Sequence, residues 1–294
     1  YKSFKLAETP FDYISDTTDS RIVKPPTFAA TLSYAAAAAQ AARLWAPYDT
    51  QKAEIYLASA VDAYNAYLMH WYEYDYTETE HPYYWSCSKE EINETSLYAP
   101  QYHSNGGEAY HDSEVIDDAY WAACEIFISA SEMGETEIAS TYKKELSESP
   151  CAYNVYSRLV SYSNKDAEFT SFNWRMSASA GSLSLLLHPE LLSDDENDKL
   201  KRTLLSSADD YIECENEQGY GIAYKYDGPP YYSPDSSNLD IPIYTNGYRY
   251  GSNGMNVTNA IIMAYAYDIT YEKKYINGVV QAMDYLLGNN PLSF

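Results

Sequence analysis

A cluster of carboxylates could perform acid and base chemistry near the middle of this chain. Asp112, Glu114, Asp117 and Asp118 lie close together at the predicted start of a helix. Paired carboxylates cleave glycosidic bonds, one acting as the acid and one as the base. Carboxylates at a helix start also accept hydrogen bonds from unpaired backbone N–H groups and interact favourably with the helix dipole. We therefore interpret Asp112 as an N-cap and Asp117 and Asp118 as bracing residues rather than catalytic ones.

Residues that could bind a metal are few and scattered. His103 and His111 share one tyrosine-rich stretch, where they could bind sugar hydroxyls or a metal, but two isolated histidines are a weak signal. The acidic residues 193–198 lack the residue order of a calcium-binding EF-hand loop, so we interpret them as a solvated turn. The cysteines show no CxxC spacing, which argues against zinc and leaves two disulfides or four buried thiols open. These cysteines are Cys87, Cys124, Cys151 and Cys214.

Tyrosine is unusually abundant: 34 Tyr accompany only 7 Phe, with 5 Trp besides. A tyrosine side chain offers a flat apolar face and a hydroxyl group. Sugars present C–H faces and hydroxyl groups together, so a tyrosine-rich acidic surface suits a carbohydrate ligand. The alternative is that tyrosine simply takes the packing positions that phenylalanine takes elsewhere, and composition does not separate the two.

The net charge of −24 argues against some classes of partner. Binding to nucleic acid or to an anionic membrane surface requires clustered Lys and Arg side chains, so we expect neither partner. No apolar run approaches the roughly 18 residues that would span a bilayer. The first residues, YKSF, lack the layout of a signal peptide, so we expect any export signal to lie upstream of this chain.

The chain reads as a series of helical hairpins, because apolar residues recur at helical spacing on both sides of short turns. The first predicted helix, 27–45, is rich in alanine, which allows neighbouring helices to approach closely, and it pairs with 51–71. Further hairpins combine 114–132 with 138–146, 177–187 with 200–211, and 253–269 with 275–287. Repeated hairpins of this length are typical of an all-α toroid or solenoid.

Long connections precede the first helix of three hairpins, over residues 72–113, 147–175 and 216–252. Loops of this length inside a compact domain are usually functional. If the first helices form an inner ring, their N-termini share one rim, and the residues before them line one groove. We predict substrate-binding roles for Trp85, Tyr110, Asp112, Trp174, Arg249 and Tyr250.

Four stretches of the chain resemble the catalytic domain of glycoside hydrolase family nine, the inverting cellulases. The strongest are residues 106–123 (GGEAYHDSEVIDDAYWAA) and Tyr250-Gly-Ser-Asn253, in which Tyr250 replaces a tryptophan that usually forms a sugar platform. The entry to the first helix, KPPTFAATL, and the Phe172-Asn-Trp174 stretch are similar to the family as well. The resemblance covers nearly the whole chain.

The resemblance implies an all-α fold of the (α/α)6 type, a barrel of six hairpins, of which this sequence shows four. We therefore predict that residues 1–294 are an incomplete portion of a single α/α-barrel catalytic domain. The family's Asp-Ala-Gly-Asp motif, which holds the attacking water, does not occur here. The family's glutamic acid catalyst follows an Asn-Pro pair that this chain reaches only at Pro291. We expect both catalytic groups outside this chain and assign none within it.

Three functions follow as alternatives. The resemblance favours inverting hydrolysis of β-1,4-glucosidic bonds in cellulose or a related β-glucan, by a larger domain that includes this chain, while the fragment alone would be inactive. A non-catalytic glucan-binding module is the second alternative. Another α/α-toroid glycosidase or a polysaccharide lyase is the third, and in it some of the carboxylates above would be catalytic. For the favoured function the resemblance implies a secreted protein with no required cofactor, and it allows a structural calcium ion.

Overall fold

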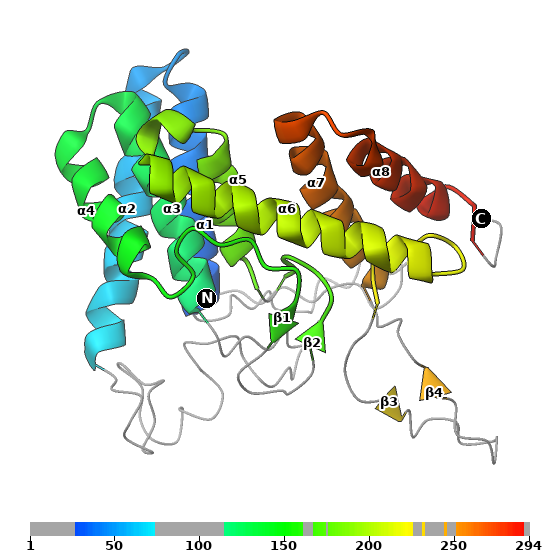
Figure 1. Ribbon diagram of the computed structural model, residues 1–294. Helices are drawn as coiled ribbons and strands as arrows, with labels where there is room; N and C mark the ends of the chain where they lie inside the picture. Colours follow the sequence, from blue (N-terminus) through cyan, green and yellow to red (C-terminus); the bar gives the residue numbers. More distant parts are fainter. Residues whose placement is uncertain are drawn as a thin grey trace, which may run out of the picture. The chain divides into compact units, whose positions relative to one another are not determined.

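A computed structural model describes residues 27–73, 115–160, 167–174, 176–225, 231–232, 244–245 and 251–290. These residues are mainly helical (Figure 1). The chain divides into two compact units, Tyr1–Lys143 and Lys144–Phe294. The first unit contains α1 (Phe28–Trp45), α2 (Thr50–Glu73), α3 (Ile116–Met133) and most of α4 (Thr136–Glu148).

The first hairpin is formed by α1 and α2, which a four-residue connection joins and which pack along each other. Thr27 caps α1, its side-chain oxygen accepting a hydrogen bond from Ala30 N at 3.2 Å. The buried face of α1 carries mainly alanines, including Ala35, Ala39 and Ala42. Their small side chains let α1 contact both α2 and α3, as the alanine-rich sequence predicted.

The helix α3 is the most deeply buried in the first unit, with nearly every residue from Asp117 to Ala130 inaccessible to solvent. It ends at Gly134, whose positive φ of 79° allows the chain to reverse and begin α4 two residues later. Its N-cap is Val115, which makes no side-chain capping bond. The interpretation of Asp112 as the N-cap was therefore wrong, because the helix begins later than the cluster of acidic residues suggested.

The second unit continues with α5 (Ala178–Leu186), a short 3-10 helix η1 (Pro189–Leu191) and α6 (Asp194–Glu217). Ser193 and Glu196 form a capping box at the start of α6, each side chain bonding to the other residue's backbone N–H, at 3.4 and 2.9 Å. The acidic residues 194–196 thus form the first turn of a helix, where the dipole favours them. Their interpretation as a solvated turn was wrong.

The last hairpin joins α7 (Ser252–Thr270) to α8 (Lys273–Leu286) through Tyr271, which caps α7 in the left-handed conformation. Both helices pack against α6. The shared core is continuous through large buried side chains such as Leu204, Tyr211 and Tyr275. Gly288 follows the end of α8 with a positive φ of 125°, a backbone conformation that favours glycine and ends the helix.

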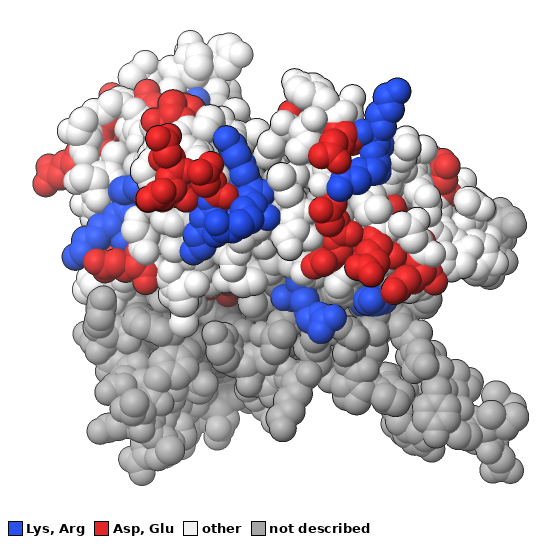
Figure 2. Space-filling model, in the orientation of Figure 1, with Lys and Arg blue, Asp and Glu red and all other residues white. Residues whose placement is uncertain are grey.

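Strands are minor among the described residues. An antiparallel pair joins β1 (Leu159–Val160) to β2 (Ala167–Glu168), and another joins β3 (Tyr231–Tyr232) to β4 (Tyr244–Thr245). The prediction of an all-α fold built from hairpins is confirmed. On the face of the second unit shown in Figure 2, acidic side chains gather over the C-terminal half of α6, whose residues 209, 210, 213 and 217 are all acidic.

Candidate functional site

Trp174 stands at the tip of a tight turn ahead of α5. Asn173 and Met176 exchange backbone hydrogen bonds of 3.0 and 3.3 Å, and the Asn173 side chain accepts a further bond of 3.0 Å from Met176 N. The Trp174 side chain is 57% exposed, which is uncommon for so large an aromatic residue. The turn therefore leaves more than half of the Trp174 surface accessible to solvent.

The segment that leads to this turn is fixed to the helices beneath it. Phe169, Thr170 and Ser171 are buried. The side-chain amide of Asn259, on α7, donates to Phe169 O at 2.9 Å. Ser171 Oγ and the Tyr211 hydroxyl, on α6, share a hydrogen bond of 2.7 Å. These contacts hold the base of the turn in one place. The backbone that carries Trp174 is therefore already ordered, and it loses little conformational entropy when a ligand binds.

Tyr211, which holds the base of this turn, is fully buried, and burial sets the protonation state of its hydroxyl group. Its ring meets Phe169 edge to face, with ring centroids 5.3 Å apart. Burial raises the pKa of the Tyr211 hydroxyl above its ordinary value, so it stays protonated at any physiological pH. It donates to Ser157 O at 3.2 Å, which fastens a second part of the preceding connection to α6.

Two buried asparagines on α7 organise the other side of this unit. Asn256 accepts a bond from Ala223 N at 2.9 Å and donates to Ala282 O, on α8, at 3.1 Å. Asn259 donates a second bond, of 2.7 Å, to Ala223 O. The segment after α6 is thus bound to the first half of α7. Sequence reasoning missed both residues, although their spacing of three on an apolar helix is a signal for buried polar anchors.

The helix α7 begins directly after Gly251, whose φ of 89° is in the left-handed region. A side chain at this position would be strained, so the Gly251 position favours glycine. The backbone can thus enter α7 through a sharp turn immediately after Tyr250. Of the predicted substrate-binding residues, only Trp174 falls within the described part of the chain. Trp85, Tyr110, Asp112, Arg249 and Tyr250 lie outside it, so their meeting in one groove stays a prediction.

Asp117 and Asp118 lie in the first turn of α3 and are 2% and 5% exposed. This burial fits the bracing role that the sequence suggested. No group of three or more His, Cys, Asp and Glu side chains that could hold a metal occurs within the described ranges. The structural calcium ion stays a prediction. No described helix is both long and apolar enough to cross a membrane.

Successive helical hairpins, with a tryptophan exposed in an anchored turn ahead of α5, define an all-α protein of the α/α-hairpin class. The sequence model of Glycosyl hydrolase family 9 matches residues 10–294. The chain belongs to this family, as its motifs indicated.

Two characterised proteins are similar to the chain. It is 30% identical over 276 residues to the "Cellulose 1,4-beta-cellobiosidase" of Acetivibrio thermocellus, covering 92% of this chain and 26% of that protein. It is 28% identical over 281 residues to "Endoglucanase C" of Cellulomonas fimi, covering 95% of this chain and 20% of that protein. The chain therefore spans about a quarter or less of these relatives.

The fold is also that of solved family members. The structure titled "Bacteroides ovatus GH9" superposes with a TM-score of 0.61 at 21% identity, over 91% of this chain and 40% of that one. The structure of "GH family 9 endoglucanase J30" gives a TM-score of 0.60 at 16% identity, with 91% and 38% covered. The prediction of an all-α fold of the (α/α)6 type is confirmed at the level of the fold.

Proposed function

We propose that this chain is part of a secreted enzyme that hydrolyses β-1,4-glucosidic bonds in cellulose or a related β-glucan, with inversion. The membership in Glycosyl hydrolase family 9 supports the reaction class. The single structural observation that carries the proposal is Trp174, a large aromatic side chain that is exposed although its base is anchored by buried hydrogen bonds. A pyranose ring stacks its C–H face on such a surface.

The described residues have a binding role in this proposal. Inversion needs an acid and a base roughly 6.5–9.5 Å apart with a water molecule between them. Asp117 and Asp118 are buried in the first turn of α3, and we assign them the bracing role that the sequence suggested. We propose that the catalytic acid and base lie outside residues 1–294. We assign Trp174 to one sugar-binding subsite of the groove that the sequence predicts.

Replacing Trp174 tests the binding role. The variant Trp174→Ala should weaken binding of cellotetraose by about 1–3 kcal/mol, because the stacked face is lost. Trp174→Phe should retain most of the affinity. Tyr48→Ala serves as a matched control, since Tyr48 is an exposed aromatic residue in the turn between α1 and α2. Equal affinities for wild type and Trp174→Ala by calorimetry would contradict the subsite.

A comparison of two chain lengths tests the reaction. Reducing-sugar release from a soluble cellulose derivative should be undetectable for residues 1–294 and readily measured for the same chain extended at both ends. Comparable rates would place the catalytic carboxylates within this chain, and Asp112–Asp118 would be the first to examine. An extended chain that binds cellotetraose without cleaving it would favour the glucan-binding module instead.

A further inference from the structure

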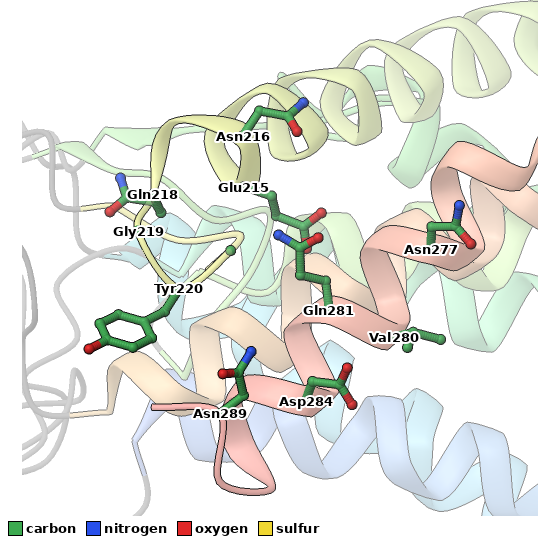
Figure 3. Close-up of a pocket in the computed structure, with 11 residues that line it drawn as sticks. Glu215, Asn216, Gln218, Gly219, Tyr220, Asn277, Val280, Gln281, Asp284 and Asn289 are labelled. Carbon is green, nitrogen blue, oxygen red and sulfur yellow. The ribbon is translucent and has the colours of Figure 1, made fainter. Parts of the chain in front are cut away.

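An open groove of 730 Å³ lies in the second unit, between the C-terminal end of α6 and the facing side of α8. Figure 3 shows its lining, which comes from α6, from the segment that follows it, and from α8 with the residues just beyond. Five of the eleven lining residues carry side-chain amides: Asn216, Gln218, Asn277, Gln281 and Asn289. The lining includes no Lys, Arg or His. Its size suits a small ligand.

Glu215 is the unusual residue of this groove. It is 4% exposed, and its Oε1 atom has no hydrogen-bond partner among the residues that the structure describes. Figure 3 shows the Glu215 and Gln281 side chains extending toward one another from the two helices. A buried polar atom without a partner costs roughly 1–3 kcal/mol, so such atoms are rare in folded proteins. Glu215 therefore lowers the stability of the unit in which it lies.

Gly278 on α8 makes room for this carboxyl group. A Cβ atom at position 278 would lie 2.8 Å from Glu215 Oε2 and 2.6 Å from both Ile212 Cδ1 and Met263 Sδ. A side chain at this position would displace Glu215 or force the helices apart. The close approach of α6 and α8 thus keeps the carboxyl group between them rather than in bulk water.

The chemistry of the lining selects the class of ligand. Burial raises the pKa of the Glu215 carboxyl to about 8, so at neutral pH it is mostly protonated and can both donate and accept a hydrogen bond. The amides also donate and accept. Without a cation in the lining, and with Asp284 beside it, the groove disfavours phosphates and other anions. The described residues include no group of three or more His, Cys, Asp and Glu side chains that could hold a metal ion. A neutral ligand rich in hydroxyl groups fits best.

Tyr220 adds an aromatic surface at one edge of the groove. Its side chain is 43% exposed. It follows Gly219 and precedes Gly221, whose φ of 63° and close contact with the Gln281 side chain leave no space for a Cβ atom. Tyr220 belongs to the lining, and Figure 3 shows its ring at the edge of the groove, pointing away from Glu215 and Gln281. An aromatic edge with hydrogen-bonding groups nearby suits a pyranose ring.

We propose that the groove between α6 and α8 is an accessory carbohydrate site, in which Glu215 hydrogen-bonds one or two pyranose units of a neutral glucan. The site is distinct from the turn that carries Trp174. The choice of a glucan, rather than another neutral sugar, rests on the proposed function. An unpartnered buried acid is a cost to folding that a ligand bound in the groove would offset.

Paired stability and binding measurements test the site. Cellotetraose is titrated into protein with 15N-labelled glycine in a Trp174→Ala background, and the amide signals of Gly219 and Gly221 are followed. We expect saturable shifts of both signals. Glu215→Leu should weaken this binding about tenfold or more while unfolding at the same or a higher denaturant concentration. Glu215→Gln, which keeps a donor and an acceptor, should bind within about threefold of the parent.

Three outcomes would overturn the accessory site. They are the absence of any glycine shift at millimolar cellotetraose, a lower stability of Glu215→Leu with unchanged binding, and shifts produced by calcium chloride but not by the sugar. Glu217→Gln is the matched control, because Glu217 lies on the same helix end and pairs in solvent with Lys225 at 3.3 Å. Loss of hydrolysis in the extended chain with intact glycine shifts would refute only the proposed function.

Discussion

Two buried glutamates, one in each unit, have opposite surroundings. Glu125 on α3 is fully buried and forms an ion pair of 2.6 Å with Arg43 on α1. It also accepts hydrogen bonds from Gln40 at 2.8 Å and from Trp121 at 3.1 Å. Glu215 on α6 lines a groove, and its buried Oε1 atom has neither a hydrogen bond nor an ion pair among the described residues. The same side chain thus joins two helices in one unit and faces an open site in the other.

The contacts around Glu125 extend into a network. Arg43 also donates to Ser129 Oγ at 3.1 Å, and Ser129 donates to Ala39 O at 2.6 Å. A buried charge is tolerated when its partners satisfy it, because desolvation is then offset by attraction and hydrogen bonding. Such a network fixes the register of α1 against α3, which is a structural role.

The largest loss of stability is expected from breaking the buried ion pair between Arg43 and Glu125. Arg43→Ala would leave the Glu125 carboxylate buried without its counter-charge, and should lower the free energy of unfolding by about 3–5 kcal/mol. Urea unfolding followed by circular dichroism measures this. Lys144→Ala is the control, since Lys144 and Glu148 form a solvent-exposed pair at 3.9 Å, and should change stability by less than about 1 kcal/mol. A loss of stability in Arg43→Ala as small as that in Lys144→Ala would contradict the structural role of Glu125.

A smaller and pH-dependent effect is expected at Glu215. Its pKa is raised by burial from the ordinary 4.5 to about 8 in the folded protein. Between these values the folded state holds a proton that the unfolded state has released. The free energy of unfolding therefore falls as pH rises from about 4.5 to 8, and this contribution is constant above pH 8.

The variant Glu215→Gln should remove this slope. Its stability advantage over wild type should grow from near zero at pH 4 to about 2–4 kcal/mol at pH 8, as measured by urea unfolding across the range. Glu217→Gln should keep the wild-type slope. An advantage of Glu215→Gln that does not change with pH would show that the carboxyl group titrates normally.

The smallest change in stability is expected at the solvent-exposed ion pair between Lys274 and Asp209. Lys274 donates to Asp209 Oδ1 at 2.6 Å, but both side chains are about half exposed. The hydrogen bond to Asp209 raises the pKa of Lys274 above its ordinary value, so the Lys274 ammonium group stays charged at physiological pH. Lys274→Ala should cost at most about 1 kcal/mol in low salt and almost nothing in 1 M salt. A loss of several kcal/mol that salt leaves unchanged would contradict this ranking.

The hairpins could be predicted from the sequence because helix formation and burial leave a local periodic pattern. Alanines on one face of α1, and Gly134 and Gly288 at helix ends, act through their own backbone or through neighbours three or four residues away. Family motifs added the fold type. The start of α3 was misplaced, because acidic residues before a helix carry no mark of which one caps it.

The two glutamates could not be told apart in this way. Both continue a buried helical stripe: Glu125 lies between Ala122 and Ser129, and Glu215 follows Ala208 and Tyr211. That signal predicts burial but not the partner. Gln40 reaches Glu125 from 85 residues earlier in the chain. Only the packing of helices shows that one carboxyl group meets an arginine and the other meets Gly278. The exposure of Trp174 is confirmed, while its sugar-binding role stays a prediction.

Site-specific titration of Glu215 tests the central contrast most directly. The carboxyl carbon of Glu215 can be followed by 13C NMR from pH 3 to pH 10 in protein labelled at glutamate, with Glu215→Gln used to assign its signal. We expect a single transition near pH 8, as for an acid buried without a partner. A transition near 4.5 would contradict the account, because Glu215 would then be solvated or paired in the folded protein.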